Sequence, residues 1–118
     1  MANAALFIGY GEAGPGRARQ ALQVFGEAMQ YYGRLQQQGQ IESFESVLLE
    51  PHGGDLSGFI LLRGDRDKLN AVRYTEEFLR ITNRATLAVQ HIGIVSGFIG
   101  EEQNRLFQDF GAQAADLG

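Results

Sequence analysis

The sequence contains no cysteine and no tryptophan, only two prolines, and a single lysine, Lys68, among its ten basic residues. Without cysteine the chain forms no disulfide bond, thiolate zinc site or iron–sulfur cluster, and it has no cysteine nucleophile. The nine arginines are scattered along the chain, and the formal net charge is -4. Proteins that bind nucleic acid usually carry a clustered basic stripe. We therefore predict no nucleic-acid partner.

Long hydrophobic runs are also absent. No segment approaches the roughly 20 apolar residues of a transmembrane helix, and residues 1–15 lack the basic start and long apolar stretch of a signal peptide. We expect no membrane partner and a cytoplasmic location. The chain has 118 residues, 44% of them hydrophobic, which suits a single domain over residues 1–118 with a core over about 4–100.

Two hydrophobic periods alternate along the chain. Compact apolar runs predict strands, and apolar positions spaced by three and four residues predict helices. The predicted strands are 4–10, 41–50, 59–62 and 91–100, and the predicted helices are 16–38, 65–88 and about 101–117. The second helix is expected to bend or restart near Thr75. The loop "PHGGDLSG" is too short for a helix, so the second and third strands form an antiparallel hairpin. The order is β-α-β-β-α-β with an extra C-terminal helix.

The stretch from Gly9 to Gly14 spells G-x-G-x-x-G, the pattern of a dinucleotide-binding turn. That turn belongs in a β-α-β unit with parallel strands, whereas here the second strand returns through a hairpin. Pro15 and Gly16 also push the helix start beyond the last glycine. We therefore predict a glycine-rich strand end and a turn, with no nucleotide and no other cofactor.

The glycines nevertheless need an explanation, because glycine inside a strand often marks the close approach of another backbone or a ligand. Gly9 and Gly11 share one face of the first strand by alternation, and Gly93 and Gly97 share one face of the fourth. These strands are neighbours in the expected topology. If the faces coincide, the four glycines form either a floor for close packing of a helix or partner, or the floor of a ligand cavity.

Each predicted strand contains neighbouring apolar residues that point to opposite sides of the sheet, such as Leu6-Phe7-Ile8 and Ile94-Val95. Right-handed crossovers place both main helices on one side. The C-terminal helix can cover only part of the other side, and an apolar patch of that size is unusual on a monomer. A second copy packed sheet against sheet covers it, so we expect a homodimer.

This pattern resembles the dimeric α+β barrel proteins, whose protomers have a ferredoxin-like β-α-β-β-α-β fold with an antiparallel four-stranded sheet. The resemblance covers about residues 4–100 and rests on topology and burial, with no family motif. It implies a pocket between sheet and helices. Members include cofactor-independent monooxygenases, haem-binding enzymes and lactone isomerases. The monooxygenases tend to use Asn, Trp and His together, and this chain has no tryptophan.

His91, at the start of the fourth predicted strand, is the candidate catalytic residue. Its imidazole titrates near neutrality, so it suits a proton shuttle; a haem or metal ligand, or simply the end of a hydrogen-bond network, are the alternatives. Related small proteins built around a His and Asp pair would need His91 or His52 near an aspartate. Asp55, Asp65 and Asp67 are the candidates, of which only Asp55 lies close in sequence to a histidine. His52 and Glu50 share a glycine-rich turn, which is a poor metal site, so we predict no metal.

Glu45 and Arg63 lie on partner strands of the hairpin among apolar residues. They are expected to face each other as a partly buried ion pair, either as a cross-strand or interface salt bridge or as an anchor for an anionic ligand. Tyr10 is expected at the rim or core with its hydroxyl reaching water. The candidate ligand-binding residues are Tyr10, Glu45, Arg63, Gly9, Gly11, Gly93 and Gly97.

Three functions remain open at this stage. The first is a homodimer that binds a small apolar or weakly anionic molecule between sheet and helices. The second is a cofactor-independent enzyme of the monooxygenase or isomerase kind, and the third is a structural or regulatory dimerisation module. The sequence does not decide whether the protein is an enzyme, because no nucleophile–base–acid motif is legible.

Overall fold

The computed structural model describes residues 2–118 and contains eight helices and strands within them. Along the chain they are β1 (Ala4–Tyr10), α1 (Ala18–Gln37), β2 (Ser43–Leu48), β3 (Gly58–Gly64), α2 (Arg66–Arg73), α3 (Glu76–Ala88), β4 (Gly93–Phe98) and α4 (Gly100–Leu117). The strands form one antiparallel sheet in the order β2-β3-β1-β4. The predicted α+β fold, its four-stranded antiparallel sheet and the extra C-terminal helix are confirmed.

Local sequence explains where the helices begin. Gly16 takes a left-handed backbone, φ 72°, in the turn before α1. Asp65 accepts a hydrogen bond from the Lys68 amide at 3.1 Å and caps α2. Thr75 accepts one from the Phe78 amide at 3.3 Å and caps α3, so the predicted restart near Thr75 is confirmed.

Two strands, β2 and β4, are shorter than predicted. Ile41 is buried but precedes β2. His91 lies two residues before β4, since Gln90 is engaged elsewhere: its amide donates to the Glu12 carbonyl, and its own carbonyl accepts from Gly11. The chain then turns at His91, with φ 57°, before it enters the sheet.

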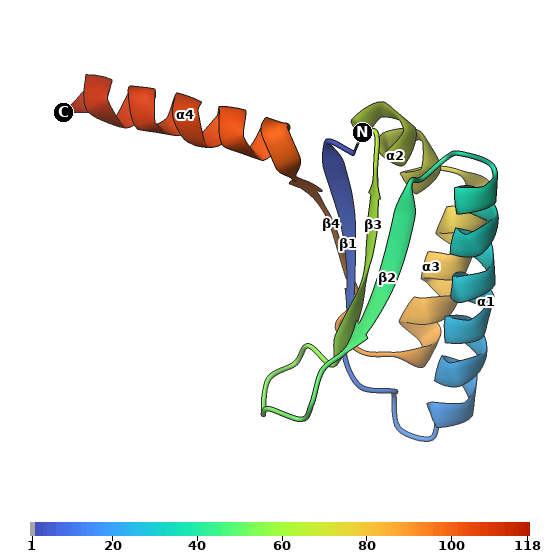
Figure 1. Ribbon diagram of the computed structural model, residues 1–118. Coiled ribbons are helices and arrows are strands. Elements are labelled where there is room, and N and C mark those ends of the chain that lie inside the picture. The colour runs from blue at the N-terminus through green and yellow to red at the C-terminus, as the bar shows by residue number, and fades with distance from the viewer. Residues whose placement is uncertain (1) are drawn as a thin grey trace.

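The core lies between the sheet and the helices α1, α2 and α3, which cover the same side of it (Figure 1). Even-numbered residues of the two central strands, such as Leu6 and Leu62, point into this layer and are fully buried. Two ion pairs fasten α1 to α3. Arg84 donates two bonds to the Glu27 carboxylate, at 2.8 and 2.9 Å, and Arg34 pairs with Glu77.

The opposite face of the sheet, called the open face below, is covered by no helix (Figure 1). Register and alternation place on it the apolar residues Phe7, Val47, Phe59, Leu61 and Val95. The Phe7 and Phe59 rings stack at 5.1 Å and shield each other, whereas Val95 is 58% exposed. The predicted apolar character of both faces is therefore present, but only one face is buried within the protomer.

Helix α4 leaves the open face uncovered, although the sequence allowed it to cover part of that face. It extends away from the end of β4, on the side of the sheet opposite α1 and α3 (Figure 1), and none of its residues is buried. The protomer is consequently elongated, with principal extents of 54, 37 and 22 Å. Among residues 2–118, no helix is both long and apolar enough to cross a membrane.

Candidate ligand-binding pocket

A pocket of about 510 Å³ lies between the sheet and the helix pair α1 and α3. Its sheet side is formed by residues of all four strands, including Ile8, Ile60 and Ile94, and its helix side includes Val24 and Ile81. The volume falls in the range of about 300–1,000 Å³ that is usual for sites of small molecules. The pocket is on the side of the sheet that the resemblance to the dimeric α+β barrel proteins implied.

Small side chains on the two helices create this space. Five alanines of these helices line it: Ala18, Ala21 and Ala28 of α1, with Ala85 and Ala88 of α3. Those of α1 lie between its first residue and its middle and those of α3 lie in its last turn, which are at the same end of the antiparallel helix pair (Figure 1). At the other end Tyr31, Leu35 and Phe78 fill the same layer. Bulky residues thus close one end, and alanines leave the other open.

The few polar groups gather where β1, β2 and the β2–β3 loop meet. Tyr10, Ser46 and Ser57 line the pocket there, the acidic residue Glu12 lines it just beyond the end of β1, and Thr82 lines it from α3. Burial raises the pKa of Tyr10 above its ordinary value, an effect that a side-chain hydrogen bond to Ser46 partly offsets. The phenol therefore stays neutral at physiological pH, and Tyr10 can donate or accept a hydrogen bond at this end of an otherwise apolar space.

The mouth of the pocket is also apolar. Leu22 of α1 and Leu48 of β2 both line the pocket, yet both are largely exposed. Phe25 of α1 is exposed as well, but to a smaller extent. Apolar side chains gathered around an opening favour entry of an apolar molecule over a strongly charged one.

The predicted ligand-binding residues divide between the two faces of the sheet. Tyr10 and Gly11 line the pocket. Gly9 and Gly93 are register partners on the open face, with Gly97 on the same face, so the predicted coincidence of glycine faces is present in these three. The Phe7 ring and Leu56 occupy the space above Gly9, while nothing lies within 4 Å of a Cβ added at Gly93 or Gly97. This floor is therefore separate from the pocket.

Gly11 lies beyond the end of β1, and backbone atoms of two other segments lie close to it. A Cβ added there would lie 2.8 Å from the Gln90 carbonyl oxygen and 2.9 Å from that of Asp55. The close approach explains why glycine occupies this position. The wall of the pocket depends on it, because any side chain would push these segments apart.

The amides of the G-x-G-x-x-G stretch are already engaged. Gly11 donates to the Gln90 carbonyl at 2.7 Å and Gly14 to the Ala88 carbonyl at 2.9 Å, and Ala13 forms a bridge with Val89. A phosphate-binding loop presents such amides free to the ligand. The stretch instead hydrogen-bonds the segment after β1 to the end of α3 and the residues that follow it, which supports the turn interpretation.

His91 lies behind the pocket wall rather than in it. Its ring Cδ2 would be 3.2 Å from a Cβ on Gly11, and its Nε2 is 3.9 Å from the Asp55 Oδ1. Both side chains are more than half exposed. The structure thus places His91 near Asp55, one of the three aspartates that the sequence offered, at the surface next to the pocket.

Glu45 and Arg63 form the expected ion pair, with Arg63 Nη1 2.7 Å from Glu45 Oε1. Their register places them diagonally on the open face, and their side chains are 50% and 38% exposed. The pair is a cross-strand salt bridge of one protomer. It does not approach the pocket between sheet and helices.

Sequence reasoning missed the residues that shape the pocket most, the alanines of α1 and α3. The usable signal was a concentration of alanine on the buried stripes of both helices at the end where they meet. It also missed Ser46, Ser57 and Thr82, for which no signal existed because their meeting depends on the fold. Within residues 2–118 no group of three or more His, Asp or Glu side chains is placed to hold a metal ion.

No protein-family model matches this sequence, and no curated protein matches it. Several solved structures share its fold. They include a dimeric protein of unknown function and ferredoxin-like fold from Bacteroides fragilis (TM-score 0.59, 12% identity, covering 81% of this chain and 96% of that one). A hydroxynitrile lyase from Passiflora edulis matches with TM-score 0.64 at 14% identity, covering 86% of this chain and 97% of its own.

SnoaB, a cofactor-independent oxygenase from Streptomyces nogalater, matches with TM-score 0.51 at 14% identity over 84% of this chain and 93% of its own. Identities this low establish the shared fold alone. The chain therefore has a ferredoxin-like α+β fold, as the sequence predicted.

Proposed function

We propose that this protein is a homodimer that binds a small, largely apolar molecule in the pocket between its sheet and the helices α1 and α3. The observation that carries the binding proposal is the alanine-lined space of about 510 Å³ with its polar groups at one end. Such a site buries the apolar body of a ligand and orients it by one hydrogen-bonding group. Tyr10 and Ser46 are the groups placed to receive it.

The homodimer is supported by the open face. A protomer that exposes Val95 on β4, with the partly exposed Leu61 and Val47 on the other strands of the same face, leaves an apolar surface in water, and burial of such surface contributes about 25 cal/mol per Å². Open space above Gly93 and Gly97 allows another sheet to approach closely. One of the similar solved structures is described as dimeric, which agrees with this arrangement.

Binding in the pocket can be tested with 1-aminoanthracene, a neutral aromatic amine whose fluorescence rises in apolar surroundings. We expect saturable binding to the wild-type protein. The double variant Ala21→Leu/Ala85→Leu adds bulk to both helix walls at partly buried positions, so the affinity should fall at least tenfold, or about 1.4 kcal/mol.

The matched control is Ala71→Leu, the same change on the exposed side of α2 and away from the pocket. It should leave the affinity unchanged. Absence of saturable binding to the wild-type protein would favour the structural or regulatory module. Equal affinity in the double variant and the control would place the probe elsewhere and contradict the proposed site.

A cofactor-independent enzyme with His91 as proton shuttle is the second candidate, and one observation favours it. His91 is the one residue other than glycine with a positive φ, 57°, among residues 2–118. That conformation costs about 1–2 kcal/mol for a residue with a Cβ, and such strain often persists where a side chain serves a function. The ring lies beside Asp55 at the edge of the pocket.

The stability of two His91 variants tests whether the strain is present. His91→Gly relieves the left-handed backbone and His91→Ala retains it, so the glycine variant should be more stable than the alanine variant by about 1 kcal/mol. Urea unfolding followed by circular dichroism measures the difference. Equal midpoints for the two variants would show that the left-handed backbone imposes no cost, and His91 would lose the observation that favours a catalytic role.

A further inference from the structure

Helix α4 carries an apolar stripe that, apart from the partly buried Leu106 near its base, is exposed to solvent in the protomer. Its positions follow steps of three, four and seven residues along one side of the helix: Leu106, Phe107, Phe110, Ala114 and Leu117. Phe107 is 67% exposed and Phe110 71% exposed. The opposite side is polar and includes Arg105, Gln108 and Asp109. We call the first set the α4 stripe.

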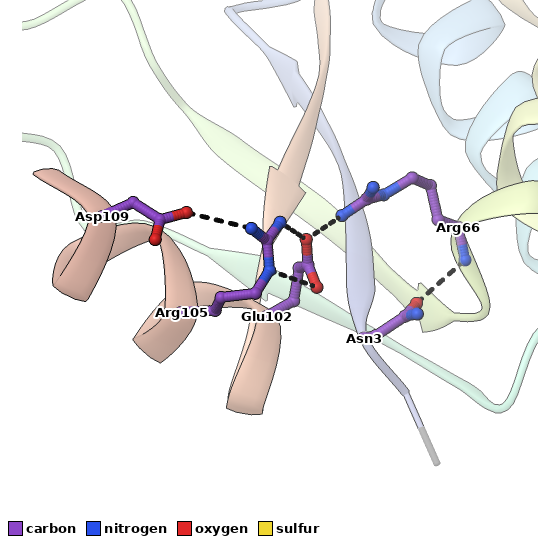
Figure 2. Close-up of polar contacts among 5 residues, drawn as sticks. All are labelled: Asn3, Arg66, Glu102, Arg105 and Asp109. Carbon is purple, nitrogen blue, oxygen red and sulfur yellow. Dashed lines mark hydrogen bonds and ion pairs between the residues drawn. The ribbon is translucent and has the colours of Figure 1, made fainter.

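The base of α4 is held firmly, so the helix leaves the body in a defined direction. Arg66 of α2 lies with Nη2 2.9 Å from Glu102 Oε1 and with its guanidinium 5.0 Å from the centre of the Phe98 ring. Figure 2 shows Glu102 between Arg66 and Arg105, with Asp109 pairing to Arg105 one turn further on.

Two further contacts complete this base. The Asn3 side chain accepts a hydrogen bond from the Arg66 amide at 3.0 Å (Figure 2). The two arginines hold the pKa of Glu102 at about 2, so its carboxylate stays charged at any ordinary pH. Gly100, with φ 63°, makes the turn that aims the helix outward.

An isolated helix of this kind is not stable by itself. Helices shorter than roughly 12–15 residues are marginal in water, and longer ones with ordinary composition gain most of their stability from packing of an apolar face. The 18 residues of α4 include Gly111 in the interior and no buried side chain. The α4 stripe therefore requires a surface outside this protomer.

We propose that α4 is an exchanged arm, whose stripe packs against a second copy of this chain while the partner's arm packs reciprocally on the first. This inference rests on the homodimer of the proposed function. The second copy is favoured because α4 projects on the same side of the sheet as the open face (Figure 1), so a protomer docked there lies beside the helix.

The surface area needed by a stable dimer supports the same occupant. Four strands spaced about 4.8 Å apart and about 20 Å long present a plane of about 400 Å², whereas a stable interface buries about 800 Å² per partner. A helix of 18 residues is about 27 Å long. One arm given and one received add to the area that the sheet alone can bury.

Charge argues against two other occupants. Apart from Arg105, the charged residues of α4 are all acidic: Glu101, Glu102, Asp109 and Asp116. Helices that lie on membranes carry lysine and arginine beside the apolar face, and partners of nucleic acid are basic. An acidic amphipathic helix fits neither, but it is compatible with a protein surface.

The arm is tested by Phe110→Glu, which places a charge in the middle of the stripe. Its matched control is Gln108→Glu, which adds the same charge on the opposite side of the same helix. Sedimentation equilibrium over a range of concentrations gives the dimer dissociation constant. We expect Phe110→Glu to raise it at least thirtyfold, the effect of losing a central aromatic anchor, and Gln108→Glu to change it less than threefold.

Hydrogen exchange of the wild-type protein provides a readout independent of mutation. Amides of α4 should be protected where the protein is dimeric and should lose protection on dilution to monomer. A dimer whose α4 amides exchange as in an unfolded chain overturns the arm. So does protection that persists unchanged in a monomer, because the helix would then pack on its own protomer.

Results that contradict the exchange of α4 can be distinguished from results that contradict the homodimer. If Phe110→Glu dimerises as tightly as Gln108→Glu while a charge on the open face abolishes dimerisation, the dimer stands and the arm is wrong. If the wild-type protein is monomeric at high micromolar concentration, both are wrong. Dissociation caused by Phe110→Glu and not by its control supports the arm.

Discussion

Replacing Val95 with glutamate is expected to convert the protein from a dimer into a monomer. Val95 lies on β4 in the open face and is 58% exposed within the protomer. In a twofold dimer the change introduces two carboxylates into the apolar contact, and burial of an unpaired charge costs several kcal/mol. The dimer dissociation constant should therefore rise by a factor of 100 or more, at about 1.4 kcal/mol for each factor of ten.

The control for this prediction is Leu87→Glu. Leu87 is 73% exposed and belongs to α3, on the covered side of the sheet. Both variants place a glutamate at an exposed apolar position, so they differ mainly in the face that carries it. Sedimentation velocity should show a monomer for Val95→Glu and a dimer for Leu87→Glu. If the two sediment alike, the open face is not the interface.

Replacing Leu62 with alanine is expected to produce the largest loss of stability. Leu62 is on β3 with no exposed surface, in the centre of the core cluster. Removal of buried methyl groups loses their transfer free energy and leaves a cavity, which together cost about 2–5 kcal/mol for leucine to alanine. Because a domain of this size is stable by only about 5–15 kcal/mol, that loss is large.

Leu87→Ala is the matched control, since it removes the same atoms from an exposed helical position and should change the free energy of unfolding by less than about 0.5 kcal/mol. Urea unfolding at one fixed protein concentration compares them, because dissociation is coupled to unfolding in a dimer. If Leu62→Ala does not fold, Ile41→Val at another buried core position should still lose about 1 kcal/mol. No loss at either position would contradict the described core.

The elements of the fold were predictable because their signals are local. Apolar runs marked the strands, and the hydroxyl of Thr75 in front of a new helical stripe marked the restart between α2 and α3. Strand ends were not predictable. Ile41 and His91 read as strand residues, but the first is buried outside the sheet and the second is displaced by pairing of Gln90 with the chain after β1.

The candidate site was only partly predictable, for a different physical reason. The alternation of residues along each strand correctly placed Gly9, Gly93 and Gly97 on one face of the sheet. It does not indicate which face of the sheet the helices cover. Arg84 binds Glu27 from 57 residues away, and nothing in local spacing indicates such a partner. The meeting of Tyr10 with Ser46 likewise depends on how β2 is added to the sheet through β3.

The layer beneath α1 and α3 is divided along its length. Tyr31, Leu35 and Phe78 pack densely at one end, while alanines leave space at the other. Substitutions at the alanine-lined end therefore alter the shape of the pocket, while the densely packed end continues to stabilise the fold. Such a scaffold can diversify its specificity over evolutionary time without each change threatening its ability to fold.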